Sequence, residues 1–202
     1  MVFAAVDYEI TYAPTEHGSV SGATTANYAQ SVMITVTPDK GYRLNSITAS
    51  AGSIVIAEDG LSATVTMADA ATTVTTTFVA IDYNITYNES ANGRISGKAT
   101  ANYQENVLVT VDPVEHYEIE KLNASNGDVK ISDDKLSAIL TMDAADATLT
   151  ATFVKKQYPI QIFVTGEGTL TASAKTAGID EQVEILIEPA PGYKLDPPSI
   201  PI

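Results

Sequence analysis

The sequence contains no cysteine and no tryptophan, and only two of its 202 residues are histidine. Without cysteine there is no disulfide framework, and a zinc or blue-copper site lacks its commonest ligands. Apolar runs are also short, because none approaches the roughly 18 residues of a membrane-spanning helix. We therefore expect no membrane insertion. The N-terminus has neither the basic segment nor the long apolar segment of an export signal.

Basic residues are scarce as well. Eleven Lys and Arg residues stand against 25 Asp and Glu residues, which gives a formal net charge of −14. An anionic chain repels the phosphates of nucleic acids, so we expect no nucleic-acid partner. We interpret the charge as one that keeps the protein soluble.

What the chain does contain is a repeat. Tyr8, Tyr83 and Tyr158 open the segments YEITY, YNITY and YPIQI at intervals of 75 residues. The period predicts module 1 over residues 8–82, module 2 over residues 83–157 and a partial module 3 over residues 158–202. Residues 1–7 resemble the ends of the first two modules, so we expect a closing strand of a preceding module or an N-terminal extension there.

Apolar residues within each module alternate with polar ones, which is the period of a β-strand with one buried face. In module 1 this pattern places Val32, Ile34 and Val36 on one face. Turn residues such as Gly and Asp separate the runs. The sequence predicts an all-β fold of tandem, sandwich-like modules of about 75 residues with antiparallel strands. We expect about seven strands per module, in module 1 near residues 8–12, 18–25, 30–37, 42–49, 53–57, 61–67 and 72–79.

Catalytic and cofactor motifs are absent from the sequence. His17 and His116 do not recur with the repeat, so we interpret both as turn residues. No Gly-x-Ser-x-Gly elbow, phosphate loop or dinucleotide fingerprint occurs. We therefore predict that the chain is not an enzyme and has no catalytic or cofactor-binding residue.

Acidic clusters are the only candidates for a metal site, because carboxylate oxygens suit calcium. They are Asp133–Asp134, Asp143 with Asp146, and Glu58–Asp59 with Asp69. Their spacing matches no defined calcium loop, so we interpret them as hairpin tips and predict no metal site.

Four tyrosines recur between the modules: Tyr8, Tyr12, Tyr28 and Tyr42 reappear as Tyr83, Tyr87, Tyr103 and Tyr117. The favoured interpretation is core packing with the hydroxyl at the edge. The alternative is an exposed aromatic row that contacts a sugar or a protein partner. The candidate ligand contacts under that alternative are Tyr28, Tyr42, Tyr103 and Tyr117.

The order of these motifs resembles the divergent internalin B-type B-repeat. The motifs are Tyr-x-Ile-Thr, Gly-x-Val at 18–20 or Gly-x-Ile at 93–95, a Val-x-Ile/Val-x-Val-x-Pro strand, Gly-Tyr, and a closing Thr-Met…Thr-x-Phe. The resemblance implies a bacterial extracellular or cell-surface protein with repeats that act as spacers or adhesive elements, and it carries no catalytic residues. The chain departs from the family pattern at Ile47 and Leu122, where a tryptophan is common, and at Asp196–Pro198 in module 3.

Three functional hypotheses follow. The first is a structural or interaction segment of a bacterial surface protein, acting as stalk, spacer or adhesin module with an unidentified protein or glycan ligand. The second is a self-assembling filament or phage-type subunit, in which terminal strands pair between chains by strand addition. The third is a carbohydrate-binding accessory module.

Overall fold

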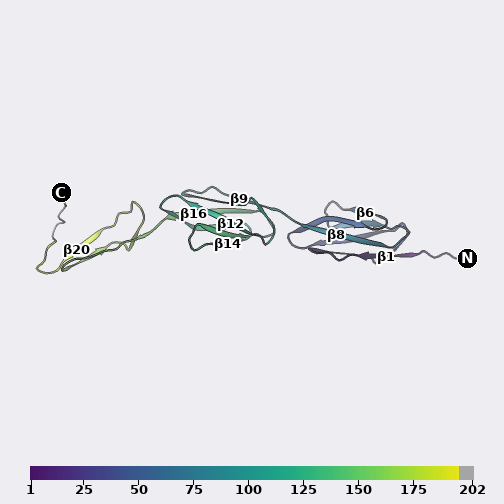
Figure 1. Ribbon diagram of the computed structural model, residues 1–202, viewed down its shortest axis with the longest axis horizontal. Coiled ribbons are helices and arrows are strands. Elements are labelled where there is room, and N and C mark those ends of the chain that lie inside the picture. Colours follow the sequence, from purple (N-terminus) through teal and green to yellow (C-terminus); the bar gives the residue numbers. More distant parts are fainter. Residues whose placement is uncertain (196–202) are drawn as a thin grey trace.

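The computed structural model describes residues 1–195, which form three β-rich bodies in a row, with the N-terminus at one end and β20 in the body at the other (Figure 1). These residues contain no helix long and apolar enough to cross a membrane. The departure from the family pattern expected at Asp196–Pro198 lies outside the described residues.

Module 1 has eight strands rather than the seven expected. They are β1 (Asp7–Tyr12), β2 (Gly18–Gly22), β3 (Thr25–Asn27), β4 (Ser31–Pro38), β5 (Tyr42–Ala49), β6 (Ser53–Ile56), β7 (Ser62–Thr66) and β8 (Thr72–Ala80). The strand expected at 18–25 is divided, because its two parts join different sheets: β2 pairs with β4, whereas β3 pairs with β1.

Two four-stranded sheets, β3-β1-β8-β5 and β2-β4-β7-β6, enclose one apolar core. Val32, Ile34 and Val36 are buried in it as the alternation predicts, together with Ile10 and Val74 from the opposite sheet. The all-β sandwich expectation is thereby confirmed.

Module 2 repeats this arrangement strand for strand. Its strands are β9 (Tyr83–Tyr87), β10 (Gly93–Gly97), β11 (Thr100–Ala101), β12 (Asn106–Pro113), β13 (Tyr117–Ala124), β14 (Asp128–Ile131), β15 (Ser137–Thr141) and β16 (Ala147–Lys155). Its core cluster contains residues of module 2 only. The two modules therefore have separate cores.

The described part of module 3 contains β17 (Tyr158–Pro159), β18 (Gly168–Ala172), β19 (Thr176–Ala177) and β20 (Ile185–Pro189). They form two antiparallel pairs, β17 with β19 and β18 with β20. These pairs correspond to β1 with β3 and β2 with β4 of module 1.

The expectation of antiparallel strands holds for every pair among the described strands except one in each complete module. The first and last strands pair in parallel, with Ile10 opposite Thr72 and Tyr12 opposite Val74 in module 1. In module 2, Ile85 lies opposite Ala147 and Tyr87 opposite Leu149. A parallel pair needs a long crossover, which the six intervening strands of each module supply.

Residues 1–6 form no strand here, and the expectation of a closing strand of a preceding module or an N-terminal extension stays a prediction. The closing strand of each complete module pairs on both sides, as β8 does with β1 and β5. Residues 1–6 have no such neighbours among the described residues, so their resemblance to β8 does not produce a ladder. The chain enters the sheet at Asp7.

Candidate functional site

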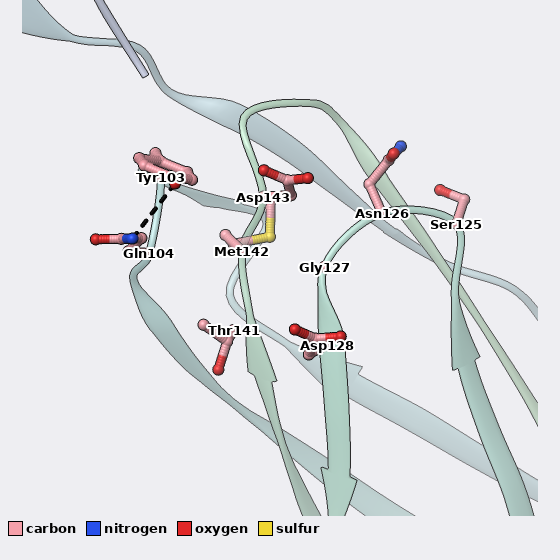
Figure 2. A pocket seen from close by; sticks show the side chains of 9 residues that line it. All are labelled: Tyr103, Gln104, Ser125, Asn126, Gly127, Asp128, Thr141, Met142 and Asp143. Atoms are coloured by element: carbon pink, nitrogen blue, oxygen red, sulfur yellow. Dashed lines mark hydrogen bonds between the residues drawn. The ribbon is translucent and has the colours of Figure 1, made fainter. Parts of the chain in front are cut away.

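A cavity of about 490 Å³ lies at the end of module 2 that faces module 1. Three loops line it, at residues 103–104, 125–128 and 141–143. Figure 2 shows the Tyr103 ring, the Asp128 carboxylate and the Asp143 carboxylate around the same space, with Gln104 Nε2 3.3 Å from Tyr103 Oη. The lining is mostly polar, which suits a hydroxyl-rich ligand better than an apolar one.

The turn between β4 and β5 of module 1 closes against this end of module 2. Lys40 Nζ lies 2.6 Å from Asp143 Oδ1 and 4.9 Å from the centroid of the Tyr103 ring. Gly41 is buried and has a φ of 85°. A Cβ at Gly41 would lie 2.4 Å from the Cβ of Tyr103, so only glycine allows this close approach. The contact between modules is therefore specific in shape as well as in charge.

The segment that joins the modules is held from the module 2 side by Asn102. Its Nδ2 donates to Ile81 O at 3.0 Å and to Asp82 Oδ1 at 2.8 Å. Asn27 makes the same pair of hydrogen bonds at the start of module 1, to Val6 O at 3.1 Å and Asp7 Oδ1 at 2.6 Å. Each complete module therefore fixes the segment that enters it.

Electrostatics stabilises the charged forms at this junction. The hydrogen bond from Lys40 and the backbone N–H of Ala144 hold the pKa of Asp143 below its usual value. The same partner raises the pKa of Lys40. Both groups are largely exposed, so the ion pair contributes more to the geometry of the junction than to stability.

A second carboxyl group with a lowered pKa lies beside Asn102. The hydrogen bond from Lys98 and the backbone N–H of Asn102 lower the pKa of Glu105. In module 1, Gln30 takes this position and its Oε1 accepts from Asn27 N at 2.9 Å. Both modules therefore make this hydrogen bond, but the acceptor side chain is charged only in module 2.

The structure separates the recurring tyrosines into two groups. Tyr8, Tyr12, Tyr83 and Tyr87 pack against the cores, as the favoured interpretation predicts. Tyr12 and Tyr87 donate from their hydroxyls to Ala23 O and Lys98 O, both at 2.9 Å, and burial raises the pKa of each phenol.

The four candidate ligand contacts are not among the tyrosines that pack against the two cores. Tyr28 is 68% exposed, and Tyr103 carries Lys40 over its ring. Tyr42 is stacked on His17 with ring centroids 4.1 Å apart, and Tyr117 is half-buried near Tyr158. Two of the rings are therefore covered by side chains of the chain itself, and a ligand role for the four tyrosines stays a prediction.

The remaining polar candidates occupy turns. His17 and His116 have φ values of 64° and 66°, which confirms them as turn residues. Asp59 and Asp134 each accept a backbone hydrogen bond from two residues further along, and Asp146 accepts one from Asn84 N at 2.8 Å. These carboxylates act as local hydrogen-bond acceptors in the loops.

Sequence reasoning missed the junction residues Lys40, Gly41 and Asn102. Asn102 could have been found, because it repeats Asn27 of module 1 after one period of 75 residues. Lys40 gives no such signal, because Glu115 replaces it in module 2, and Gly41 recurs only as Gly192 of module 3, since His116 replaces it in module 2.

Comparison with known proteins supports the family resemblance. The model of the divergent InlB B-repeat domain matches residues 8–82 and again residues 83–157, which together are most of the chain. No curated protein matches it. The domain is a bacterial surface repeat module, and it is not a known enzyme family. The boundaries of both matches coincide with the two complete modules of the fold, and the chain belongs to the divergent InlB B-repeat family.

Proposed function

We propose that modules 1 and 2 act as a tension-resisting stalk or spacer in an extracellular protein of a bacterial cell surface. The observation that carries this proposal is the parallel pairing of the first and last strands of each module. The chain enters a module on one of these strands and leaves it on the other. Tension along the array therefore pulls two adjacent strands in opposite directions along their length.

Such a pull loads the hydrogen bonds of the parallel pair in shear, so that they must break together. β8 is also held on its other side by β5, over seven residue pairs from Tyr42–Ala80 to Ala49–Val74. The strand that carries the load is thus central in its sheet. An array of such modules resists extension until a whole module opens.

The junction supports the same proposal. Only Ile81 and Asp82 separate β8 from β9, and Asn102 hydrogen-bonds both. A two-residue connection with these bonds cannot act as a flexible linker. Together with the contact of Gly41 against Tyr103, it favours a stiff array.

Single-molecule force spectroscopy on the intact chain tests this function. Handles at the two ends load β1 and β8 in shear, and likewise β9 and β16. We expect two unfolding steps of similar length, each releasing the 75 residues of one module, or about 25 nm at 3.3–3.6 Å per residue.

A matched control loads the same module in a different direction. Because the chain has no cysteine, handles can be attached through Ser50→Cys and Thr73→Cys, at neighbouring ends of the antiparallel β5–β8 pair. This geometry breaks the ladder one bond at a time and should require a clearly lower force. Equal forces in the two geometries would contradict the proposal.

The cavity at Tyr103 favours carbohydrate binding as a second candidate function. Its polar lining beside an aromatic ring is a chemistry that saccharides use. Tyr103→Ala should abolish the chemical-shift changes of Asn126 and Asp128 on addition of a saccharide identified by a glycan array, whereas Tyr117→Ala should leave them unchanged. An array without any binding would remove this candidate.

A further inference from the structure

The edge strands of the two complete modules differ in how they are guarded against further pairing. An edge strand carries unpaired backbone N–H and C=O groups, and natural proteins commonly protect it with charged side chains. In module 2 the edge strand β14 has Asp128 and Lys130. The equivalent edge strand of module 1, β6, has Ser53 and Val55 at these positions and carries no charge.

β6 also has exposed apolar side chains. Val55 is 69% exposed and Ile56 is 44% exposed. On the outer face of the sheet, Val55 lies opposite Thr64 of β7, which in turn lies opposite Met33 of β4. No other edge strand of the two complete modules has an exposed large apolar side chain. An uncharged and apolar edge of this kind is suited to the addition of another strand.

We propose that two copies of the chain associate through β6, with the two strands antiparallel and Val55 of one copy opposite Val55 of the other. This register also places Ile54 opposite Ile56 of the second copy, and Ser53 opposite Ala57. It joins the sheet β2-β4-β7-β6 of one copy to the same sheet of the other. The interface uses the same residues on both copies, so the association closes at the dimer.

The backbone of β6 has the hydrogen-bonding phase that this register needs. Alternate residues of an antiparallel strand direct their N–H and C=O groups to the same neighbouring strand. Ala57 N donates to Ser62 O at 2.9 Å, so Ala57 and Val55 direct these groups to β7. Ile54 and Ile56 therefore direct theirs to the open side of the sheet. In the dimer each Ile54–Ile56 pair exchanges two N–H···O bonds, as in an ordinary antiparallel ladder.

The side chains are compatible with this register in face and in charge. Ile54 packs against the core of module 1, and Ile56 lies on the same face of β6. Pairing them covers the exposed side chain of Ile56, while Val55 meets Val55 on the outer face. In β14 the same register would place Lys130 opposite Lys130, and like charges directly opposite each other destabilise a strand pair. The proposed dimer is therefore specific to module 1.

The size and charge of the interface make the association weak. β6 has four residues, whereas stable interfaces bury at least about 1,200 Å² in total. Each copy has a formal net charge of −14, so added salt should strengthen the pairing by screening the repulsion.

Antiparallel pairing also sets the direction of the two copies. The strands of module 1 run along the row of modules, so the paired copies point in opposite directions (Figure 1). With the cell-surface location proposed above, such a dimer joins copies carried by two facing cells. The dimer itself does not depend on that location, and the experiments below test the dimer alone.

Disulfide trapping on the intact chain tests the register. The chain has no cysteine, so Val55→Cys introduces one thiol per copy. In the proposed dimer the two Val55 positions form a non-hydrogen-bonded pair with Cα atoms about 4.5 Å apart, which a disulfide can span. Met33→Cys is the matched control, because Met33 is 71% exposed on the same face but lies two strands further from the two-fold axis.

We expect Val55→Cys to form disulfide-linked dimers about tenfold faster than Met33→Cys at the same concentration, because pairing raises the local concentration of the two thiols. Equal rates for the two variants would overturn the proposal.

Amide hydrogen exchange provides a second measurement, which needs no cysteine. The amides of Ile54 and Ile56 should exchange more slowly as the protein concentration rises, whereas the equivalent amides of β14 should not change. Val55→Lys gives β6 the residue that β14 has at this position, and it should remove the concentration dependence. Exchange at Ile54 and Ile56 that is independent of concentration, or slowing that persists in Val55→Lys, would show that a second copy does not pair with β6 in this register.

Discussion

Thr76 shows at the residue scale how the two modules differ inside a common core. It is 4% exposed on β8, and among residues 1–195 its Oγ1 is the buried side-chain polar atom without a hydrogen-bond partner. Module 2 has Ala151 at this position. A buried hydroxyl without a partner retains its desolvation cost and contributes no bond in return.

Thr76→Val should therefore raise the free energy of unfolding of module 1 by about 1 kcal/mol, because valine keeps the shape and removes the unpaired hydroxyl. Thr72→Val is the matched control. Thr72 is equally buried on the same strand, but its Oγ1 bonds Ala51 N at 3.1 Å and Ala51 O at 2.8 Å, so the change should destabilise. Urea denaturation of both variants measures the difference. A loss of stability for Thr76→Val equal to that for Thr72→Val would contradict the explanation.

Gly41 carries a prediction about the junction. Gly41→Ala places a Cβ against Tyr103 and forces an L side chain to a φ of 85°, which costs about 1–2 kcal/mol in the left-handed region. Gly60→Ala has a similar backbone cost, at a φ of 66°, but its Cβ would meet only Leu44 at 4.0 Å. Both variants should lower the melting temperature of module 1, and only Gly41→Ala should shift the ring resonances of Tyr103. Unchanged Tyr103 resonances in Gly41→Ala would show that the contact is absent in solution.

At the scale of elements, we expect the loop between β11 and β12 of module 2 to be acid-sensitive through Glu105, because the corresponding loop between β3 and β4 of module 1 has the uncharged Gln30 instead. The pKa of Glu105 is lowered from 4.5, so its stabilisation is present above that pH and is lost as the pH falls through the lower folded-state pKa. Gln30 makes the corresponding bond in module 1 without a charge.

Glu105→Gln should therefore lower the melting temperature of module 2 near neutral pH, because the attraction to Lys98 is lost. The difference from the unmodified chain should shrink as the pH is lowered below 4.5, since protonation removes the same charge from the native glutamate. Gln30→Ala, which has no titrating group, is the control and should show a pH-independent difference. A constant difference for Glu105→Gln would exclude this role of the carboxylate.

The strands were the most predictable elements. Alternation fixes which face of a strand is buried, and it correctly placed Val32, Ile34 and Val36 in the core. It contains no information on which strand lies beside which, so the parallel pairing of β1 with β8 was not foreseen. The division of the strand at 18–25 was missed for a related reason, because its two parts alternate correctly but join different sheets.

At the scale of the whole molecule, the 75-residue period predicted the modules and their order but not the contact between them. That contact depends on Lys40 and Gly41 of one module and on Asp143 of the next, and neither Lys40 nor Gly41 is repeated at the next junction. There, His116 and Ile179 stand in place of Gly41 and Tyr103, and His116 Nδ1 lies 3.3 Å from Tyr158 Oη instead. Period analysis detects what is common to the modules, whereas these junction residues are particular to one boundary.

The central claim is that modules 1 and 2 form one stiff unit that transmits tension. Residual dipolar couplings of the backbone amides in residues 8–157 test it most directly, because they report the orientation of each module in solution. The structure predicts that a single alignment tensor fits the couplings of both modules together, and that Gly41→Ala requires two. Two tensors of different magnitude for the unmodified chain would mean that the modules reorient independently, and would contradict the account.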